Sequence, residues 1–165
     1  MSASHAGARH AAAPSLADDE VYEDSPPVTR MAVAVLSLVG LLLSAYLSLF
    51  KLGVIESLTC QIGSCDRVQS SPWAVFLGIP VPYLGVAGYV GLLAVSLAGL
   101  QPRFSRERWV ALSLFAMSAA GVAFSAYLTY LEAFRIRAWC MWCVISAVLM
   151  TVIFLLTIPG LRRAR

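Results

Sequence analysis

The chain has 165 residues, of which 59% are hydrophobic and only 13% are charged. Average soluble chains are roughly 45–50% apolar and about 25% charged, so too few polar side chains remain here to cover a soluble enzyme, and too many apolar ones for disorder along most of the chain. The formal net charge of +3 is too small to indicate nucleic acid as a partner. The composition predicts an integral membrane protein that has lipid as its main neighbour.

Residues 1–30 differ from everything after them. They mix acidic and basic side chains with the pair Pro26–Pro27, show no apolar period, and lack the apolar segment that follows the basic start of a secretory signal. We expect a disordered cytoplasmic tail. His5 and His10 could bind a metal in principle, but a solvated tail accounts for both, and we predict no metal site.

Four uncharged stretches follow the tail, at residues 31–50, 68–102, 109–131 and 138–161. A spanning helix needs about 20 apolar residues, because a core of ~30 Å is crossed at 1.5 Å per residue. Prolines break the start of the second stretch, so its helix is placed after them, with Pro82 in the first turn.

The sequence thus predicts an all-α integral membrane fold over residues 31–161. It is a four-transmembrane-helix bundle with a partly irregular extracytoplasmic loop, and the predicted helices cover about residues 31–51, 82–100, 109–131 and 138–159.

Basic residues predict the orientation of the bundle. With both termini in the cytoplasm, eight Lys and Arg residues lie inside and four outside. The inside set includes three arginines in the short loop between the second and third helices: Arg103, Arg106 and Arg108. We therefore expect a multi-pass protein of the cytoplasmic (inner) membrane with both termini inside and every cysteine outside.

A weak internal repeat relates the first and third helices. Residues 44–48 (SAYLS) match residues 125–129 (SAYLT), and a cysteine follows the first serine after 16 and 15 residues respectively. Small residues are common on the packing faces of membrane helices, so chance and true pseudo-symmetry both remain open. In either case the two helices lead to cysteines on the same side of the membrane.

The four cysteines form two close pairs. Cys60 and Cys65 lie in the first outer loop as Cys-x4-Cys, and Cys140 and Cys143 form a Cys-x2-Cys at the start of the fourth helix. Disulfides persist outside the cytoplasm. None of the four lies in the middle of a helix, so packing of a small apolar side chain explains them poorly.

Three hypotheses account for these pairs. Two structural disulfides would suit a non-catalytic membrane protein, although a Cys-x2-Cys bridge closes so small a loop that it adds little stability. The spacing permits a four-cysteine zinc site, but neither pair lies in a glycine-rich knuckle. Redox chemistry is favoured, because a helix N-terminus stabilises a thiolate and a second pair permits thiol–disulfide exchange.

A redox pair at the edge of the membrane is well placed to reduce a lipid-soluble quinone. Trp139 and Trp142 flank the second motif, where a role at the membrane interface explains them as well as stacking on a quinone ring does. Ser70 and Ser71 follow the first pair. Either hydroxyl could donate a hydrogen bond to a quinone carbonyl, or could form a cap or turn before Pro72.

Three segments together resemble the vitamin K epoxide reductase family in its bacterial form. They are residues 65–73 (CDRVQSSPW), residues 78–82 (GIPVP) with Gly85, and residues 140–143 (CMWC). The resemblance covers about residues 37–157. The unrelated four-helix, quinone-linked oxidases of the thiol pathway carry their Cys-x2-Cys in the first outer loop, whereas here it comes second.

The resemblance implies a role for each residue. Cys140 and Cys143 would form the active pair, with Cys143 facing the quinone. Cys60 and Cys65 would form the shuttle pair, with Cys60 meeting the partner protein and Cys65 exchanging with Cys140. Ser71 would bind the quinone carbonyl.

The resemblance also implies the activity: a membrane thiol:quinone oxidoreductase that supports extracytoplasmic disulfide bond formation, with ubiquinone or menaquinone as electron acceptor. Ala147 stands where the animal enzymes carry a tyrosine, and Val81 or a neighbour stands where they carry an asparagine. Quinone reduction is therefore expected rather than epoxide reduction. Many bacterial members carry a fused thioredoxin-like domain. This chain ends at Arg165, so a separate thioredoxin-like thiol oxidase is the expected partner.

Overall fold

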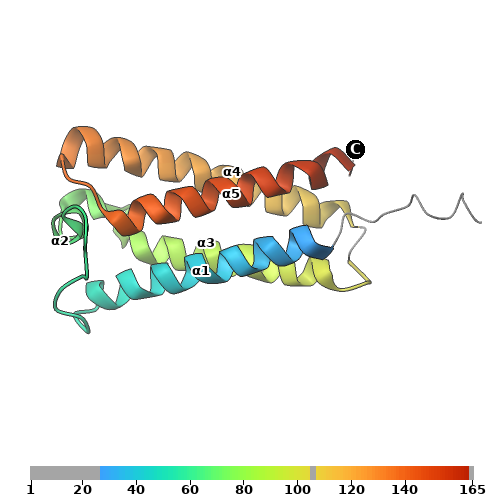
Figure 1. The fold of residues 1–165 in the computed structure, drawn as a ribbon, viewed down its shortest axis with the longest axis horizontal. Helices are drawn as coiled ribbons and strands as arrows, with labels where there is room; N and C mark the ends of the chain where they lie inside the picture. Colours follow the sequence, from blue (N-terminus) through green and yellow to red (C-terminus); the bar gives the residue numbers. More distant parts are fainter. Residues whose placement is uncertain (1–26, 105–106, 164–165) are drawn as a thin grey trace, which may run out of the picture.

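Four long helices make up most of the protein. A computed structural model describes residues 27–104 and 107–163. The long helices are α1 (Pro27–Lys51), α3 (Val81–Leu100), α4 (Arg108–Tyr130) and α5 (Met141–Arg163). Each is long and apolar enough to cross a membrane, and they lie side by side in one bundle (Figure 1). The predicted fold class, an all-α membrane bundle of four helices, is confirmed.

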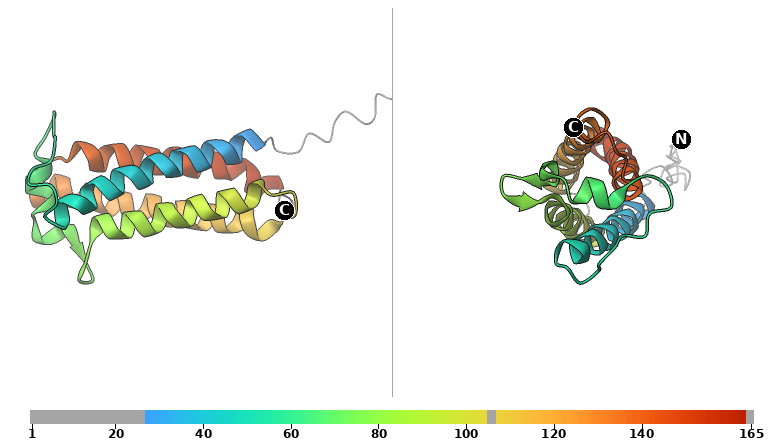
Figure 2. Two further views of the ribbon diagram at one scale, coloured as in Figure 1. Left: turned by 90° about the horizontal axis from the view of Figure 1, so that it is seen from below. Right: turned by 90° about the vertical axis from the view of Figure 1, so that its left-hand side faces the viewer.

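One end of the bundle is covered by short elements between α1 and α3. They are helix α2 (Cys65–Gln69), the 3₁₀ helix η1 (Pro72–Ala74) and the antiparallel pair β1 (Val75–Phe76) and β2 (Ile79–Pro80). Figure 2 shows α2 lying across this end of the four helices. We call this end of the bundle the cysteine end, because all four cysteines lie there. The first residue of α1 and the last of α5 lie at the opposite end (Figure 1).

Small residues allow the helices to pack closely. α1 packs chiefly against α3, and α4 against α5. A Cβ atom on Gly40 of α1 would collide with the ring of Tyr89 on α3, and one on Gly121 of α4 would lie 2.6 Å from the sulfur of Met150 on α5. Tyr89 is buried at the centre of the core, and its hydroxyl lies 2.8 Å from Ser146 Oγ. Close approach through small residues is typical of helices that pack within a membrane.

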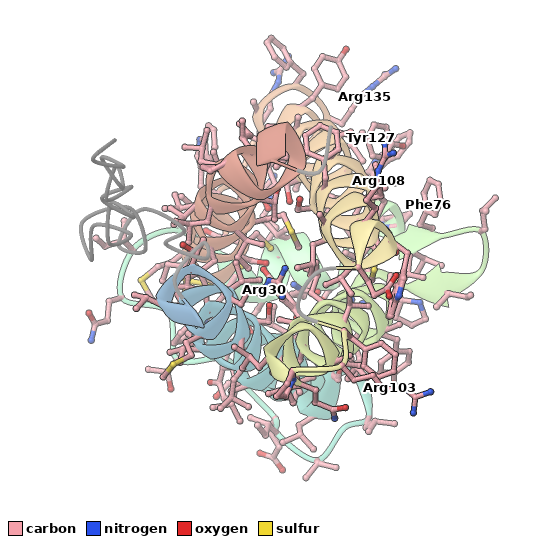
Figure 3. The ribbon with its side chains drawn as sticks, turned by 90° about the vertical axis from the view of Figure 1, so that its right-hand side faces the viewer. Arg30, Phe76, Arg103, Arg108, Tyr127 and Arg135 are labelled. Atoms are coloured by element: carbon pink, nitrogen blue, oxygen red, sulfur yellow. A yellow bond between two sulfur atoms is a disulfide. The ribbon has the colours of Figure 1, made fainter. Side chains whose placement is uncertain are left out.

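Two helix starts differ from the predicted ones by more than one residue, and α5 ends at Arg163 rather than at residue 159. α1 begins at Pro27, four residues earlier than expected, with proline in the first turn where its missing N–H is not needed. Arg30 in that turn points inward between the helices, whereas Arg103 points outward (Figure 3). The Arg30 guanidinium donates to the carbonyl oxygen of Gly99, which ties α1 to the end of α3. His5 and His10, with the rest of residues 1–26, lie outside the described residues.

The second difference lies between α4 and α5. A π-helical segment, η2 (Leu131–Ile136), continues α4, and Arg137 then adopts a left-handed conformation with a φ of 53°. α5 consequently begins at Met141 rather than at residue 138. Residues 138–140 are not helical, and Cys140 forms an antiparallel bridge with Gly63 of the loop.

The internal repeat has a local structural counterpart. Ser48 Oγ donates to Ser44 O at 2.7 Å, and Thr129 Oγ1 donates to Ser125 O at 2.9 Å, so both copies use the same bond within their helix. The central tyrosines differ, because Tyr46 OH accepts a hydrogen bond from a loop N–H whereas the Tyr127 ring packs on Phe76.

Candidate active site

Both cysteine pairs lie at the cysteine end, in different chemical states. Cys60 and Cys65 form a disulfide, and Cys140 and Cys143 are free thiols. Cys65 is 1% exposed and Cys140 is fully buried, and they belong to one buried cluster with Leu47, Leu58, Val68 and Ala138. The buried member of the loop pair therefore packs in the same cluster as the buried member of the helix pair.

Backbone pairing joins the loop to the segment before α5. Ser64 N donates to Trp139 O at 2.9 Å, and Gly63 pairs with Cys140. Gly63 has a φ of 96°, and a Cβ atom there would collide with the carbonyl oxygen of Trp139. Position 63 thus requires glycine for two reasons, its backbone conformation and the close approach of the Trp139 backbone. This contact fixes the loop pair beside Cys140.

A second contact fixes the residue before Cys60. Trp142 Nε1 donates to Thr59 O at 2.9 Å, and Thr59 N donates to Tyr46 OH at 3.0 Å. The rings of Tyr46 and Trp142 meet edge to face with centroids 5.4 Å apart. Trp142 therefore has a role in the structure that neither of the two explanations from the sequence included.

Cys143 lines a pocket between the helices and the loop. Its empty volume is about 310 Å³, counting the space that is open to solvent. The other lining residues are Val68, Gln69, Trp73, Ala74, Val81, Leu128, Leu131, Glu132 and Ile136. A mainly apolar lining with a few polar groups is typical of small-molecule sites.

Gln69, the last residue of α2, is one of the two polar residues besides Cys143 in this lining. Its side chain is 3% exposed, and Nε2 donates to Cys143 Sγ at 3.7 Å. Its Oε1 atom is buried, and no donor among the described residues reaches it. The Lys51 ammonium donates to the Gln69 carbonyl oxygen, which holds α2 against the end of α1. A buried acceptor without a partner is costly, so this oxygen is suited to a ligand that donates a hydrogen bond.

Glu132, in η2, is the second polar residue besides Cys143 in the pocket lining. It is 3% exposed, and its Oε2 accepts a hydrogen bond from Cys140 N at 3.1 Å. Glu132 and Cys143 both line the pocket. Glu132 is not among the site residues predicted from the sequence. The available signal was an acidic residue directly after an uncharged stretch of membrane-spanning length, where ionisable groups are rare and functional.

The two thiols interact directly. A hydrogen bond with the Cys143 thiol lowers the pKa of Cys140, and this effect exceeds that of burial, which acts to raise it. Cys140 immediately precedes the first residue of α5, so the thiolate that the sequence predicted at the helix start lies where the helix dipole also favours negative charge.

The predicted quinone ligand, Ser71, lies beside the pocket. It is half-buried, its Oγ donates to Val68 O at 2.8 Å, and it is not among the lining residues. Trp73, two residues further on, does line the pocket, and its ring lies 5.6 Å from the guanidinium carbon of Arg135. Ser71 can reach a ligand only if its hydroxyl leaves Val68 O, so its role stays a prediction.

Two observations concern the other two hypotheses for the cysteines. Among the described residues, no group of three or more His, Cys, Asp or Glu side chains could hold a metal ion. Two structural disulfides would require both pairs to be bridged, whereas Cys140 and Cys143 are thiols.

Comparison with known proteins connects this geometry to a family. The sequence model of the Vitamin K epoxide reductase family matches residues 31–158, a range that holds both cysteine pairs and the whole pocket. The thiol-disulfide oxidoreductase LTO1 of Arabidopsis thaliana is 28% identical over 125 residues, which make up 72% of this chain. The match covers 33% of that relative, so the chain spans about a third of its length.

Proposed function

The chain belongs to the vitamin K epoxide reductase family, and on this premise we propose that it is a membrane thiol:quinone oxidoreductase. It takes electrons from a thioredoxin-like protein, passes them through its two cysteine pairs to a quinone, and so supports disulfide formation outside the cytoplasm. The observation that carries the proposal is the position of Cys143, a free thiol that lines an apolar pocket next to a second, bridged cysteine pair.

The first part of the relay is thiol–disulfide exchange. A dithiol of the partner reduces the Cys60–Cys65 disulfide, and the partner leaves oxidised. Cys65 thiolate then attacks Cys140 of an oxidised Cys140–Cys143 pair and releases Cys143. Attack by Cys60 on Cys65 restores the loop disulfide and leaves two thiols at the helix start. The burial of Cys65 with Cys140 supports this order, because only Cys60 of the loop pair is partly accessible.

The second part is electron transfer to the acceptor. A quinone such as ubiquinone or menaquinone, held in the pocket, would supply the two-electron sink. The apolar lining suits its ring, and the unpartnered Gln69 Oε1 suits the hydroxyl group of the reduced product. Ser71 remains our candidate for a hydrogen bond to the quinone carbonyl. A bridged loop pair beside two thiols is the state that follows exchange and precedes electron transfer.

We further propose that the protein lies in the cytoplasmic membrane with the cysteine end outside. The arginines of the short loop between α3 and α4 favour the cytoplasm, and disulfides persist on the other side. Reporters fused after Arg165 and within residues 99–105 should both give a cytoplasmic signal. An external signal from either would contradict the orientation.

The proposal is tested with the purified full chain, a thioredoxin-like dithiol protein and a short-chain quinone, by following quinone absorbance over time. Wild-type protein should reduce the quinone catalytically, and Cys143→Ser, which keeps size but cannot form the disulfide, should not. A wild-type protein without quinone reduction would contradict the proposed activity. Equal rates in the two proteins would contradict the role of Cys143.

A further inference from the structure

We propose that Glu132 is a catalytic residue, which carries protons from the cysteine thiols to the oxygen atoms of the quinone. The inference rests on the proposed function and goes beyond it, because neither the cysteine motifs nor the family comparison assigns Glu132 a role. Its basis is the position of one buried carboxyl group, which accepts a hydrogen bond from Cys140 N and lines the same pocket as Cys143.

The reaction requires proton transfer as well as electron transfer. Oxidation of Cys140 and Cys143 breaks two S–H bonds and forms one S–S bond. Two electrons and two protons leave the thiols, and the quinone takes up all four to become a hydroquinone. The protons therefore have to cross from sulfur to oxygen within the pocket, where the lining is mainly apolar and offers few groups able to carry them.

Only two of the ten residues that line the pocket can exchange a proton in this way, Cys143 and Glu132. Cys143 is itself a reactant. Two cationic side chains contact lining residues without entering the lining: the Lys51 ammonium donates to the Gln69 carbonyl oxygen, and the Arg135 guanidinium lies over the Trp73 ring. Glu132 is thus the one proton carrier among the described lining residues that is not consumed in the reaction.

The position of the Glu132 carboxyl group suits this task. Oε2 accepts the Cys140 N–H, which fixes the group, and the Cys143 side chain lines the same pocket. No basic side chain among the described residues forms an ion pair with it. A buried carboxyl group without a cation can hold a proton instead of remaining charged, so it can alternate between the two forms.

The Glu132 carboxylate takes the proton of Cys143, and the resulting thiolate is the stronger reductant. The carboxylic acid gives this proton to one quinone oxygen, and the regenerated carboxylate takes the proton of Cys140. The Cys140–Cys143 bond forms as two electrons pass to the quinone, and the carboxylic acid gives the second proton to the other quinone oxygen. Glu132 ends the cycle unchanged.

The backbone around Glu132 is specialised for this placement. α4 changes from α-helical to π-helical geometry at Leu131, one residue before Glu132, and Ala138 N donates to Glu132 O at 3.2 Å where the segment ends. Single π-helical turns inside helices occur frequently at functional sites. The changed geometry aims the glutamate at Cys140, which lies across the connection to α5.

The test uses Glu132→Gln, which keeps the size and the acceptor for Cys140 N–H but cannot carry a proton. Glu107→Gln, at an exposed glutamate at the opposite end of the bundle, is the matched control. We expect Glu132→Gln to reduce quinone about 10²-fold or more slowly, within the usual range for loss of a general acid–base group. Glu132→Asp should recover part of the rate, and Glu107→Gln should match wild type.

A second readout needs no quinone. Infrared difference spectra between the oxidised and the dithiol-reduced protein should show a carboxyl band that shifts in deuterated water, because the carboxyl group responds to the thiols beside it. The band should persist in Glu107→Gln and vanish in Glu132→Gln. Wild-type protein without such a band would overturn the inference, and this comparison does not depend on whether the variant folds.

The outcomes also separate the inference from the proposed function. Wild-type protein that fails to reduce quinone overturns both. Wild-type activity together with an unimpaired Glu132→Gln overturns only the role of Glu132. A slow Glu132→Gln that retains the infrared band would mean that the carboxyl group only positions Cys140, which also overturns proton transfer.

Discussion

Trp142, in the Cys-x2-Cys motif, donates its indole N–H to the carbonyl oxygen of Thr59, the residue that precedes Cys60. Thr59 in turn donates its own backbone N–H to Tyr46 OH. The start of the active-site helix and the end of α1 thus hold the loop cysteine pair from two sides. The arrangement connects the loop pair, which receives electrons in the proposed relay, with the Cys-x2-Cys pair, which passes them to the quinone.

Replacement of Trp142 by phenylalanine tests this connection. The variant keeps a ring against Tyr46 but loses the hydrogen bond, which contributes about 0.5–1.5 kcal/mol. We expect turnover with a protein dithiol to slow roughly two- to twelvefold, at about 1.4 kcal/mol per tenfold change in rate. Turnover with dithiothreitol should not change, because a small dithiol does not need the loop pair. Trp139→Phe is the control, since Trp139 contacts the loop through its backbone. A variant that is slowed equally with both donors would argue for general damage to the site.

The activity that each cysteine variant retains should depend on the electron donor. Cys140→Ser and Cys143→Ser should be inactive with every donor, because they remove the pair that faces the pocket. Cys60→Ser should be inactive with a thioredoxin-like protein but active with dithiothreitol, which reduces the inner pair directly. Quinone absorbance with the two donors measures the difference. Equal loss of dithiothreitol activity in Cys60→Ser and Cys143→Ser would show that the relay order is wrong.

Ser71→Ala should slow quinone reduction about tenfold to hundredfold and leave disulfide exchange intact. A hydroxyl donor gains strength as negative charge develops on the carbonyl oxygen, and a well-ordered donor of this kind contributes about 2.7–4 kcal/mol. A smaller value is expected here, because the hydroxyl must first leave Val68 O. Ser70→Ala is the control. A normal rate in Ser71→Ala with a slow Ser70→Ala would identify the other hydroxyl as the donor, and normal rates in both would exclude a serine.

Gln69→Leu should slow quinone reduction without lowering the stability of the fold. The change removes a buried oxygen that has no partner among the described residues, so the unfolding midpoint should stay level or rise. It also removes the contact with Cys143 Sγ, and we expect quinone reduction to fall about tenfold, equivalent to about 1.4 kcal/mol. Thermal unfolding and quinone absorbance are measured on the same preparation. A lower unfolding midpoint would mean that Gln69 is needed mainly for the fold.

Much of the fold could be predicted from local features of the sequence. Uncharged runs of about 20 residues and prolines at the start of α3 identified the helices, because the thickness of the membrane sets their length. The non-helical segment before α5 could not be predicted. It depends on the pairing of Gly63 with Cys140, a contact between residues far apart in the chain.

The site could be predicted only in part, for the same reason. The cysteines are recognisable by their spacing, but Glu132 and Gln69 lie in the pocket because of a π-helical turn and a five-residue helix. Neither element has a periodic signal in the sequence. The prediction of Ser71 depends on its chemistry and its spacing from Cys65, and these features do not reveal that its hydroxyl bonds to the backbone.

The most direct test of the account is the redox state of Cys140 and Cys143 in cells that express the full chain with and without quinone synthesis. Alkylation of free thiols in membranes, followed by counting of the modified cysteines, measures it. If the pair passes its electrons to quinone, depletion of quinone should make thiols accumulate at Cys140 and Cys143 as long as the thiol donor is present. A pair that stays oxidised without quinone would contradict electron transfer to quinone and would favour a structural disulfide.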